Sequence, residues 1–165
     1  MAALSLRART RELWDEHNPG LDTSPMEVVA LVKRITALLE LAVEPIYDGA
    51  ELTAAEVSLL VPLRHVEEDV TAIRLAERLN MSRAGVSKTL AKLERRGLIA
   101  RVPDPADRRA ALITMTDTGK AAIDDLFPRE LEAHGRLLAG LGPDRAAVVS
   151  ALTLLADTME AALDA

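Results

Sequence analysis

The sequence of 165 residues contains no cysteine. This absence excludes disulfide bonds, zinc sites built on cysteine, and regulation by thiol oxidation. Aromatic residues are nearly as rare, with one Trp, one Tyr and one Phe, although 49% of the residues are hydrophobic. A chain of this length can bury a sizeable core. That core must consist of aliphatic side chains and alanine, which favours helices.

Long apolar runs and common enzyme motifs are also absent. No stretch of about 18 apolar residues is free of charge, and the first residues lack the apolar block of a signal peptide, so we expect a soluble, cytoplasmic protein. There is no Gly-x-Ser-x-Gly elbow, phosphate-binding glycine loop or His-Glu-x-x-His pair, so we expect neither an enzyme nor a cofactor. The one local group that could hold a divalent ion is His65 with Glu67, Glu68 and Asp69, where a solvated acidic turn is the commoner structure.

Residues 71–97 have the pattern of two short helices joined by a tight turn. The first helix follows Thr71, a good N-cap, and repeats apolar residues at helical spacing: Ala72, Leu75, Ala76 and Leu79. Asn80-Met81 comes next, and asparagine tolerates the left-handed backbone at which a helix stops. Ser82 is then a suitable N-cap for the second helix. The pattern predicts a helix-turn-helix.

The second helix has one apolar face and one outward face. The inner face repeats Val86, Leu90 and Leu93 at i, i+4 and i+7. The outer face is small or basic: Ala84, Lys88, Ala91 and Arg95. Small residues near its start would let the helix enter a major groove, where Arg83, Ser87 and Lys88 could reach base edges or phosphates. Gly97 suits the position just after the helix.

Three residues at the ends of the second helix have alternative roles. Ser82 is first a cap, and only secondarily a phosphate ligand. Arg95 and Arg96 lie near a helix C-terminus, where they can equally complement the helix dipole or remain in solvent.

Residues 98–114 indicate a two-stranded wing. The runs 98–102 and 110–114 read as strands around residues 103–109, where two prolines stop the sheet from continuing. A projecting loop that carries Arg108 and Arg109 suits a narrow minor groove, whose negative potential attracts guanidinium groups. We expect Asp107 to orient one of these arginines.

In order and spacing, these motifs resemble the MarR (multiple antibiotic resistance regulator) family of transcription factors. The most specific part combines Leu-Glu-Arg-Arg-Gly-Leu-Ile at 93–99, Asp-Arg-Arg at 107–109 and Thr-x-x-Gly at 116–119. The resemblance implies a homodimer that reads a pseudo-palindromic operator, with Ser87 and Lys88 as recognition-helix contacts and Asp107 and Arg109 as the wing pair. Ala84-Gly85 replaces hydroxyl residues often found there, which leaves the base preference open.

The charge distribution agrees with a nucleic-acid partner despite a net charge of -6. Residues 83–109 contain eight Lys or Arg against three acids, which is +5, whereas the remainder has 12 basic and 23 acidic residues, which is -11. Basic charge is therefore concentrated in the elements expected to read the groove, and an acidic body discourages contact by other faces.

Three helices are predicted before this unit, near residues 6–14, from 25 to about 43, and from 54 to about 60. A capping box of Thr53 and Glu56 starts the third of these helices, and Pro62 should end or distort it. Further helices should start at Thr116, with a bend at Pro128, and at Pro143. The fold class is mainly α with a small two- or three-stranded β-wing, in a single domain over 1–165. A winged helix-turn-helix lobe spans 51–116, and 24–50 and 117–165 form dimerisation helices. The alternative for these apolar helices is a larger intramolecular bundle.

The predicted function is a sequence-specific, homodimeric DNA-binding regulator that acts as a repressor. A lipophilic or aromatic acid could release it by binding between the first long helix, residues 59–65 and the start of the helix after Thr116. Operator, regulated genes, effector and the choice between repression and activation stay open. Two other classes remain: a winged module for protein contact, and a helical scaffold without nucleic-acid activity. A steep salt dependence of DNA affinity would distinguish the regulator from both.

Overall fold

A computed structural model describes residues 6–66, 70–105 and 110–163. The elements in chain order are α1 (Leu6–His17), α2 (Pro25–Tyr47), α3 (Ala54–Leu63), β1 (Val70–Thr71), α4 (Ala72–Arg78), α5 (Arg83–Arg95), β2 (Ile99–Pro103), β3 (Ala111–Met115), α6 (Asp117–Leu138), the 3-10 segment η1 (Ala139–Asp144) and α7 (Arg145–Leu163). The three strands form an antiparallel sheet in the order β1-β3-β2. The expected mainly helical architecture with a β-wing is confirmed.

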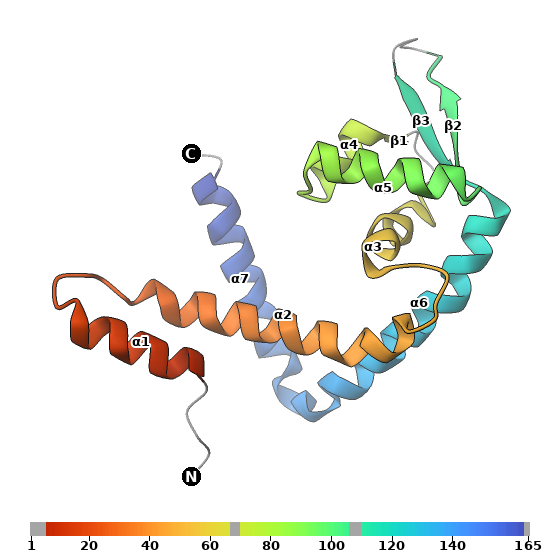
Figure 1. Cartoon of the computed structure of the whole chain (residues 1–165). Coiled ribbons are helices and arrows are strands. Elements are labelled where there is room, and N and C mark those ends of the chain that lie inside the picture. Colours follow the sequence, from red (N-terminus) through yellow and green to blue (C-terminus); the bar gives the residue numbers. More distant parts are fainter. Residues whose placement is uncertain (1–5, 67–69, 106–109, 164–165) are drawn as a thin grey trace.

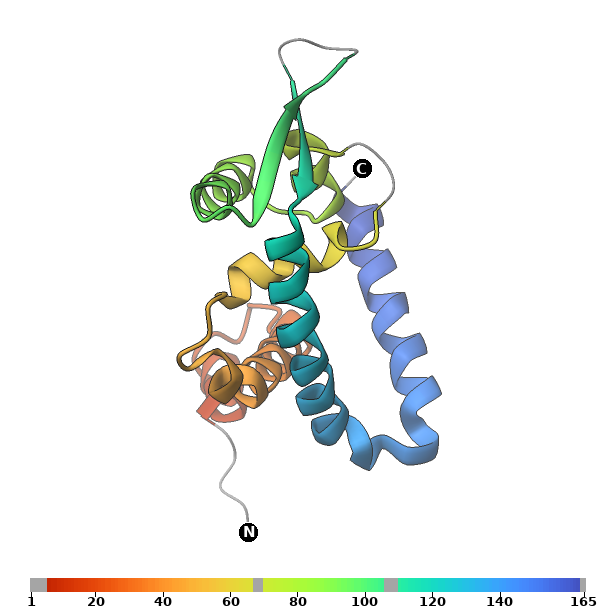
Figure 2. The same ribbon diagram turned by 90° about the vertical axis from the view of Figure 1, so that its right-hand side faces the viewer.

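The lobe built from α3, α4, α5 and the sheet lies at one end of the molecule, and long helices extend from it (Figure 1). Helix α6 leaves the wing and passes against α2, and the hydroxyl of Tyr47 on α2 donates a 2.6 Å hydrogen bond to Glu130 on α6. After η1 the chain reverses, and α7 runs back while diverging from α6 (Figure 1 and Figure 2). Helix α1 folds back on α2, where Arg11 pairs with Glu27 at 3.0 Å.

The hydrophobic core lies inside the lobe and continues into the first half of α6. Helices α3 and α5 contribute the side chains with no exposed surface: Leu59, Leu60, Val86, Leu90 and Leu93. From α6, Ile123 and Leu126 join the same cluster. Each fully buried aliphatic side chain contributes about 1.5–3 kcal/mol, so this cluster fixes how α5 is rotated relative to α3 and α6.

Several element boundaries differ from the sequence prediction. Helix α2 continues to Tyr47 through Pro45, and α3 continues to Leu63 through Pro62. Pro62 has no backbone N–H to donate within the helix. Burial of Leu59, Leu60 and Leu63 in the lobe core stabilises α3 despite this lost hydrogen bond. Helix α6 runs through Pro128 to Leu138, which agrees with the expectation that this proline lies within the helix. The last helix starts at Arg145 instead of Pro143, because the segment before it is η1.

A third strand, β1, completes the sheet. Val70 pairs with Ile113 and Thr71 with Leu112. A two-residue strand leaves almost no periodicity in the sequence, so its position depends on the edge that β3 offers.

The helices outside the lobe carry large exposed apolar surfaces. In the described part of the chain, no residue of α7 is buried. The exposed side chains on α2 and α7 include Val28, Leu31, Val32, Ile35, Leu38, Leu41, Val149, Leu152, Leu154, Met159 and Leu163. By length and composition alone, a window within Asp117–Leu163 could also cross a membrane, and none of that window is buried. The single chain therefore leaves these helices without a partner for their apolar faces.

Candidate nucleic-acid interface

The corner between α4 and α5 is built by local hydrogen bonds. The Thr71 side chain accepts from the backbone N–H of Arg74, and the Ser82 side chain accepts from that of Gly85 at 3.1 Å. Between the helices Asn80 takes a left-handed backbone with φ of 53°, as expected. A Cβ at Gly85 would lie 2.9 Å from the Ser82 hydroxyl oxygen, so glycine leaves room for this cap. The corner thus sets the start of α5.

Helix α5 is fixed by its buried side and presents its other side to solvent. Val86, Leu90 and Leu93 have no exposed surface. The opposite side is exposed: Ser82, Arg83, Ala84, Ser87, Lys88 and Arg95. Five residues of α5 and its N-cap were predicted from the sequence to contact DNA, and all five are therefore exposed: Ser82, Arg83, Ser87, Lys88 and Arg95. Gly97, with φ of 70°, ends the helix as expected.

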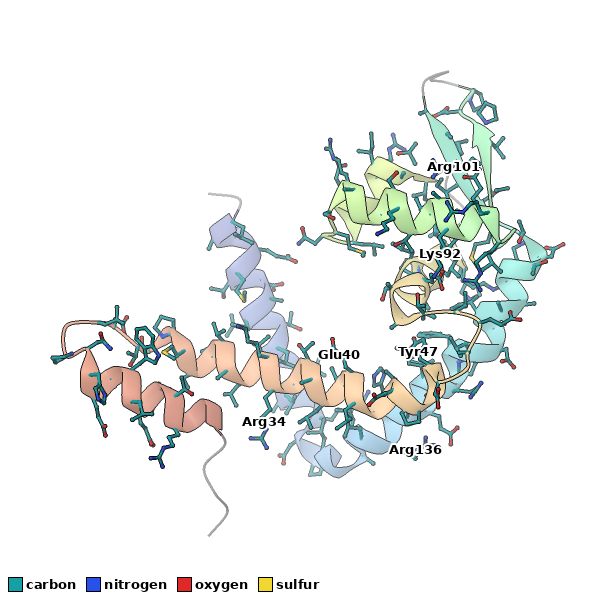
Figure 3. All side chains as sticks on the ribbon, in the orientation of Figure 1. Arg34, Glu40, Tyr47, Lys92, Arg101 and Arg136 are labelled. Carbon is teal, nitrogen blue, oxygen red and sulfur yellow. The ribbon has the colours of Figure 1, made fainter. Side chains whose placement is uncertain are left out.

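Some basic side chains of α5 and the wing pair with an acid and others do not. A count of charges along the sequence does not reveal this difference. Lys92 and Arg96 both pair with Glu56 on α3, at 3.1 and 2.9 Å. Arg101 on β2 pairs with Glu94 at 2.9 Å. In the described part of the chain, Lys88 and Arg95 form no ion pair. Figure 3 shows the positions of Lys92 and Arg101.

Arg83 is intermediate between these groups, because it forms an ion pair that is exposed to solvent. It pairs with Glu77 of α4 at 2.9 Å, and both side chains are more than half exposed. An exposed pair of this kind is worth about 0–1 kcal/mol, so DNA phosphate could replace Glu77 as its partner.

The wing extends from the end of α5. Strands β2 and β3 pair from Ile99 with Met115 to Pro103 with Ala111, and the amide of Asp104 donates to the carbonyl of Ala110 at 3.2 Å. Asp107, Arg108 and Arg109, the predicted contacts at the wing tip, lie outside the described residues. Their roles stay predictions.

The Thr-x-x-Gly motif fastens the wing to α6. Thr116 caps α6 by accepting from the Gly119 amide at 3.0 Å, and its hydroxyl donates to the Gly97 carbonyl at 2.6 Å. The Thr116 amide donates to the carbonyl of Leu98 at 3.2 Å. At Gly119, a Cβ would overlap that same carbonyl oxygen. The motif therefore joins the end of α5, the start of the wing and the start of α6 at one backbone crossing.

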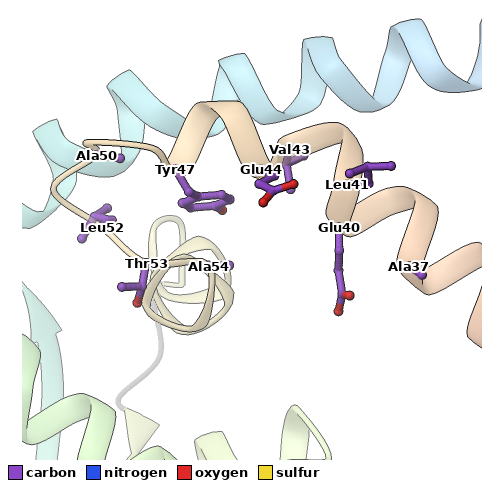
Figure 4. Close-up of a pocket in the computed structure, with 10 residues that line it drawn as sticks. All are labelled: Ala37, Glu40, Leu41, Val43, Glu44, Tyr47, Ala50, Leu52, Thr53 and Ala54. Carbon is purple, nitrogen blue, oxygen red and sulfur yellow. The ribbon is translucent and has the colours of Figure 1, made fainter.

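Two cavities flank α3. The first, of about 530 Å³, lies between the second half of α2 and the start of α3, and its lining includes the acids Glu40 and Glu44 together with Tyr47 (Figure 4). The second, of about 350 Å³, lies between α3 and α6 and is lined by Val61, Arg64, His65, Ile123, Asp124, Phe127 and Pro128. The structure thus has separate cavities where the sequence predicted one cleft: the first is lined by two acids, and the second by Arg64 and His65 together with Asp124.

Arg64 and Asp124 form a paired contact at the second cavity. The Arg64 Nε and Nη2 atoms donate to the two oxygens of Asp124, each at 2.7 Å. The hydrogen bonds from Arg64 hold the pKa of Asp124 below its usual value. Among the described residues no group of three or more side chains could hold a metal ion, and the three acids that follow His65 lie outside them.

Comparison with known proteins decides the family. Residues 50–110 match the model of the MarR family. Over 77% of its length, the chain is also 30% identical to CouR from Rhodococcus jostii RHA1, with a TM-score of 0.66, and the alignment covers 88% of that structure. The chain belongs to the MarR family. The resemblance inferred from the motifs is confirmed, and the chain is a DNA-binding transcriptional regulator.

Two more similar proteins cover most of the chain. The HTH-type transcriptional regulator PecS from Dickeya dadantii is 27% identical over 128 residues, which are 76% of this chain and 77% of PecS. BpsR from Bordetella bronchiseptica is 27% identical with a TM-score of 0.71, over 79% of this chain and 93% of that structure. The DNA binding of BpsR is regulated by 6-hydroxynicotinic acid, and the CouR structure is bound to p-coumaroyl-CoA.

Sequence reasoning missed two contacts of this MarR-family chain. Glu56 was identified as part of a capping box, which is confirmed, but its ion pairs to α5 were not predicted. The apolar residues that surround it in α3 are the signal that this acid would be buried. The pair between Arg64 and Asp124 left no such signal, because 60 residues separate its partners.

Proposed function

We propose that this MarR-family regulator is a homodimeric repressor that binds a pseudo-palindromic operator and is released by an aromatic acid. The observation that carries the DNA-reading part is the exposed face of α5, whose orientation is held by three fully buried side chains. The proposed contacts are Ser82, Arg83, Ser87, Lys88 and Arg95 from α5 and its cap, with Asp107, Arg108 and Arg109 from the wing. These contacts would be made in the cytoplasm, where the operator DNA is accessible.

The dimer is supported by α7. A 19-residue helix with no buried residue in the described chain has little to stabilise it, because most helical stability in proteins comes from packing an apolar face. A two-fold partner that covers α2, the end of α6 and α7 would bury these faces. It would also place two copies of α5 about 34 Å apart, one turn of DNA. A dimer lying across a promoter blocks access to it, which is the basis for proposing repression.

The effector is proposed to bind the cavity between α3 and α6. A carboxylate in this cavity could hydrogen-bond to Arg64 in place of Asp124 and would also lie near His65. The cavity beside α2 is the poorer choice for an anion, since Glu40 and Glu44 line it. Because the Arg64–Asp124 pair links the lobe to α6, competition for Arg64 would alter the position of the lobe relative to the dimer helices. The aromatic acid that regulates the DNA binding of BpsR supports this class of effector.

The DNA-binding proposal is tested by the salt dependence of affinity for an operator selected from random duplexes. Replacing Lys88 by Ala should lower the slope of log affinity against log salt by about 0.9, the value for one phosphate contact. Arg145→Ala, which removes one positive charge at the start of α7, is the matched control and should leave the slope unchanged. An unchanged slope in Lys88→Ala, or wild-type affinity that does not vary with salt, would contradict the proposed interface.

The effector site is tested separately with 6-hydroxynicotinic acid, benzoate and benzyl alcohol, a neutral analogue of benzoate that lacks the carboxylate. At least one of the two acids should raise the melting temperature and weaken operator binding, whereas the alcohol should do neither. Arg64→Gln should remove the response while retaining operator binding. Equal responses to benzoate and benzyl alcohol would eliminate Arg64 as the anchor.

A further inference from the structure

A buried carboxylate lies between α3 and the recognition helix. Glu56 is 1% exposed and is the only charged side chain in the buried core of the described residues. Burial raises the pKa of Glu56. Hydrogen bonds from Thr53, Lys92 and Arg96 together lower it by more than burial raises it, so the resulting pKa lies below the ordinary value. Glu56 is therefore ionised at neutral pH.

Both oxygens of this carboxylate are occupied. Oε2 accepts the backbone N–H of Thr53 at 2.8 Å, which fixes Glu56 to the start of α3. Oε1 accepts from Arg96 Nη1 at 2.9 Å and lies 3.1 Å from Lys92 Nζ. Arg96 also donates to the backbone carbonyl of Glu51. One acid on α3 thus holds two cations that are four residues apart, Lys92 on α5 and Arg96 at its C-cap.

The three cations Lys88, Lys92 and Arg96 form one row along α5. Each step of four residues turns about 40° around the helix, so the row winds from the exposed face toward α3. Lys92 is 49% exposed and Arg96 is 32% exposed, so both long side chains have a path to solvent. Without an acid on α3, they could extend toward the DNA backbone next to Lys88.

We propose that Glu56 is a positioning residue that determines DNA specificity. It fixes the rotation of α5 and withholds Lys92 and Arg96 from the phosphates, so that the N-terminal half of the helix makes the contacts that distinguish sequences. Phosphate contacts carry no direct sequence information, whereas contacts to base edges do. The inference rests on the proposed role of α5 as the groove-reading helix.

The test compares Glu56→Gln with Glu51→Gln, which makes the same charge change at an exposed side chain five residues away. Affinity is measured for the selected operator and for a scrambled duplex over a range of salt concentrations. In Glu56→Gln, the ratio of operator to scrambled affinity should fall by about tenfold or more, comparable to the loss of one base contact. Its slope on scrambled DNA should steepen by about 0.9 to 1.8, because one or two cations become able to reach phosphates. Glu51→Gln should match the wild type.

Further variants keep the test independent of how well Glu56→Gln folds. Arg96→Gln and Lys92→Gln should each leave the scrambled-DNA slope unchanged, since neither cation contacts DNA in the wild type. Adding both changes to Glu56→Gln should return that slope to the wild-type value without restoring the ratio of operator to scrambled affinity. Folding of every variant is verified by circular dichroism.

The proposal is overturned if Arg96→Gln and Lys92→Gln each lower the slope by about 0.9, the signature of direct phosphate contacts. It is also overturned if Glu56→Gln weakens operator and scrambled DNA equally with no change of slope, which is the behaviour of a purely structural residue. Failure of the proposed function would instead appear in the wild type and Lys88→Ala, whose results do not depend on Glu56.

Discussion

The replacement of Gly119 by Ala tests the backbone crossing that joins the wing to α6. A Cβ at this position would overlap the carbonyl oxygen of Leu98 and lie 2.9 Å from its carbonyl carbon, closer than the 3.0 Å limit of real Cβ contacts. The obstructing atoms belong to backbone, so no side-chain rotation relieves the overlap. Either the first turn of α6 or the start of β2 must move.

The loss of stability can be worked out from the hydrogen bonds and the packing at this crossing. Moving α6 would break the bonds from Thr116 to the carbonyls of Gly97 and Leu98, at 2.6 and 3.2 Å. Each such bond contributes about 0.5–1.5 kcal/mol, and forcing an extra methyl into packed structure costs about 1–3 kcal/mol. Alanine recovers about 0.5–1 kcal/mol over glycine within a helix. We therefore expect Gly119→Ala to lower the free energy of unfolding by roughly 2–4 kcal/mol.

Gly135→Ala provides a control in the same helix. Among the described residues, no atom outside the adjoining residues and the backbone of α6 lies within 4 Å of a Cβ built at Gly135, so this variant should gain the helix-propensity term of about 0.5–1 kcal/mol. Both variants are measured by urea unfolding, followed by circular dichroism at one protomer concentration, because dimerisation makes apparent stability depend on concentration. A Gly119→Ala protein as stable as the wild type, or two variants that shift in the same direction, would refute the reasoning.

Three further predictions concern other parts of the chain. Leu154→Glu introduces a charge at a side chain that is 69% exposed in the single chain; if α7 forms the subunit interface, sedimentation should show loss of the dimer, and an unchanged dimer would exclude this face. Tyr47→Phe removes the 2.6 Å hydrogen bond to Glu130 and should lower unfolding free energy by about 1–2 kcal/mol, whereas wild-type stability would mean that this contact does not hold α2 to α6. The pKa of Glu56 is lowered below 4.5, so its contribution to stability is complete above pH 4.5 and is lost as pH falls through the folded-state pKa. Urea unfolding as a function of pH should show a smaller acid loss in Glu56→Gln, and identical profiles would contradict the assigned charge state.

The local features of the DNA-reading unit could be predicted because each depends on a few neighbouring residues. The caps at Thr71, Ser82 and Thr116 bond to amides within three residues, and Asn80 and Gly97 take left-handed backbone where a helix must end. The inward face of α5 followed from helical periodicity in the same way.

The extent of helices at proline was less predictable. Pro62 removes one backbone donor, and from the sequence this appeared sufficient to end or distort α3. The helix continues to Leu63 because its apolar side chains are buried against the lobe core, and that burial outweighs the local loss. The strength of such packing depends on elements that follow later in the chain.

The amino-acid sequence alone determined where the helices begin, which face of α5 is apolar and where basic residues gather, since periodicity and capping operate over a few residues. Only the tertiary structure decided which of these cations pair with an acid. Arg95 and Arg96 are neighbours with the same charge, yet Arg96 is held by Glu56, an acid 40 residues earlier, whereas Arg95 lies on the exposed face. Helical rotation separates the two side chains, and the packing of α3 against α5 gives one of them a buried partner.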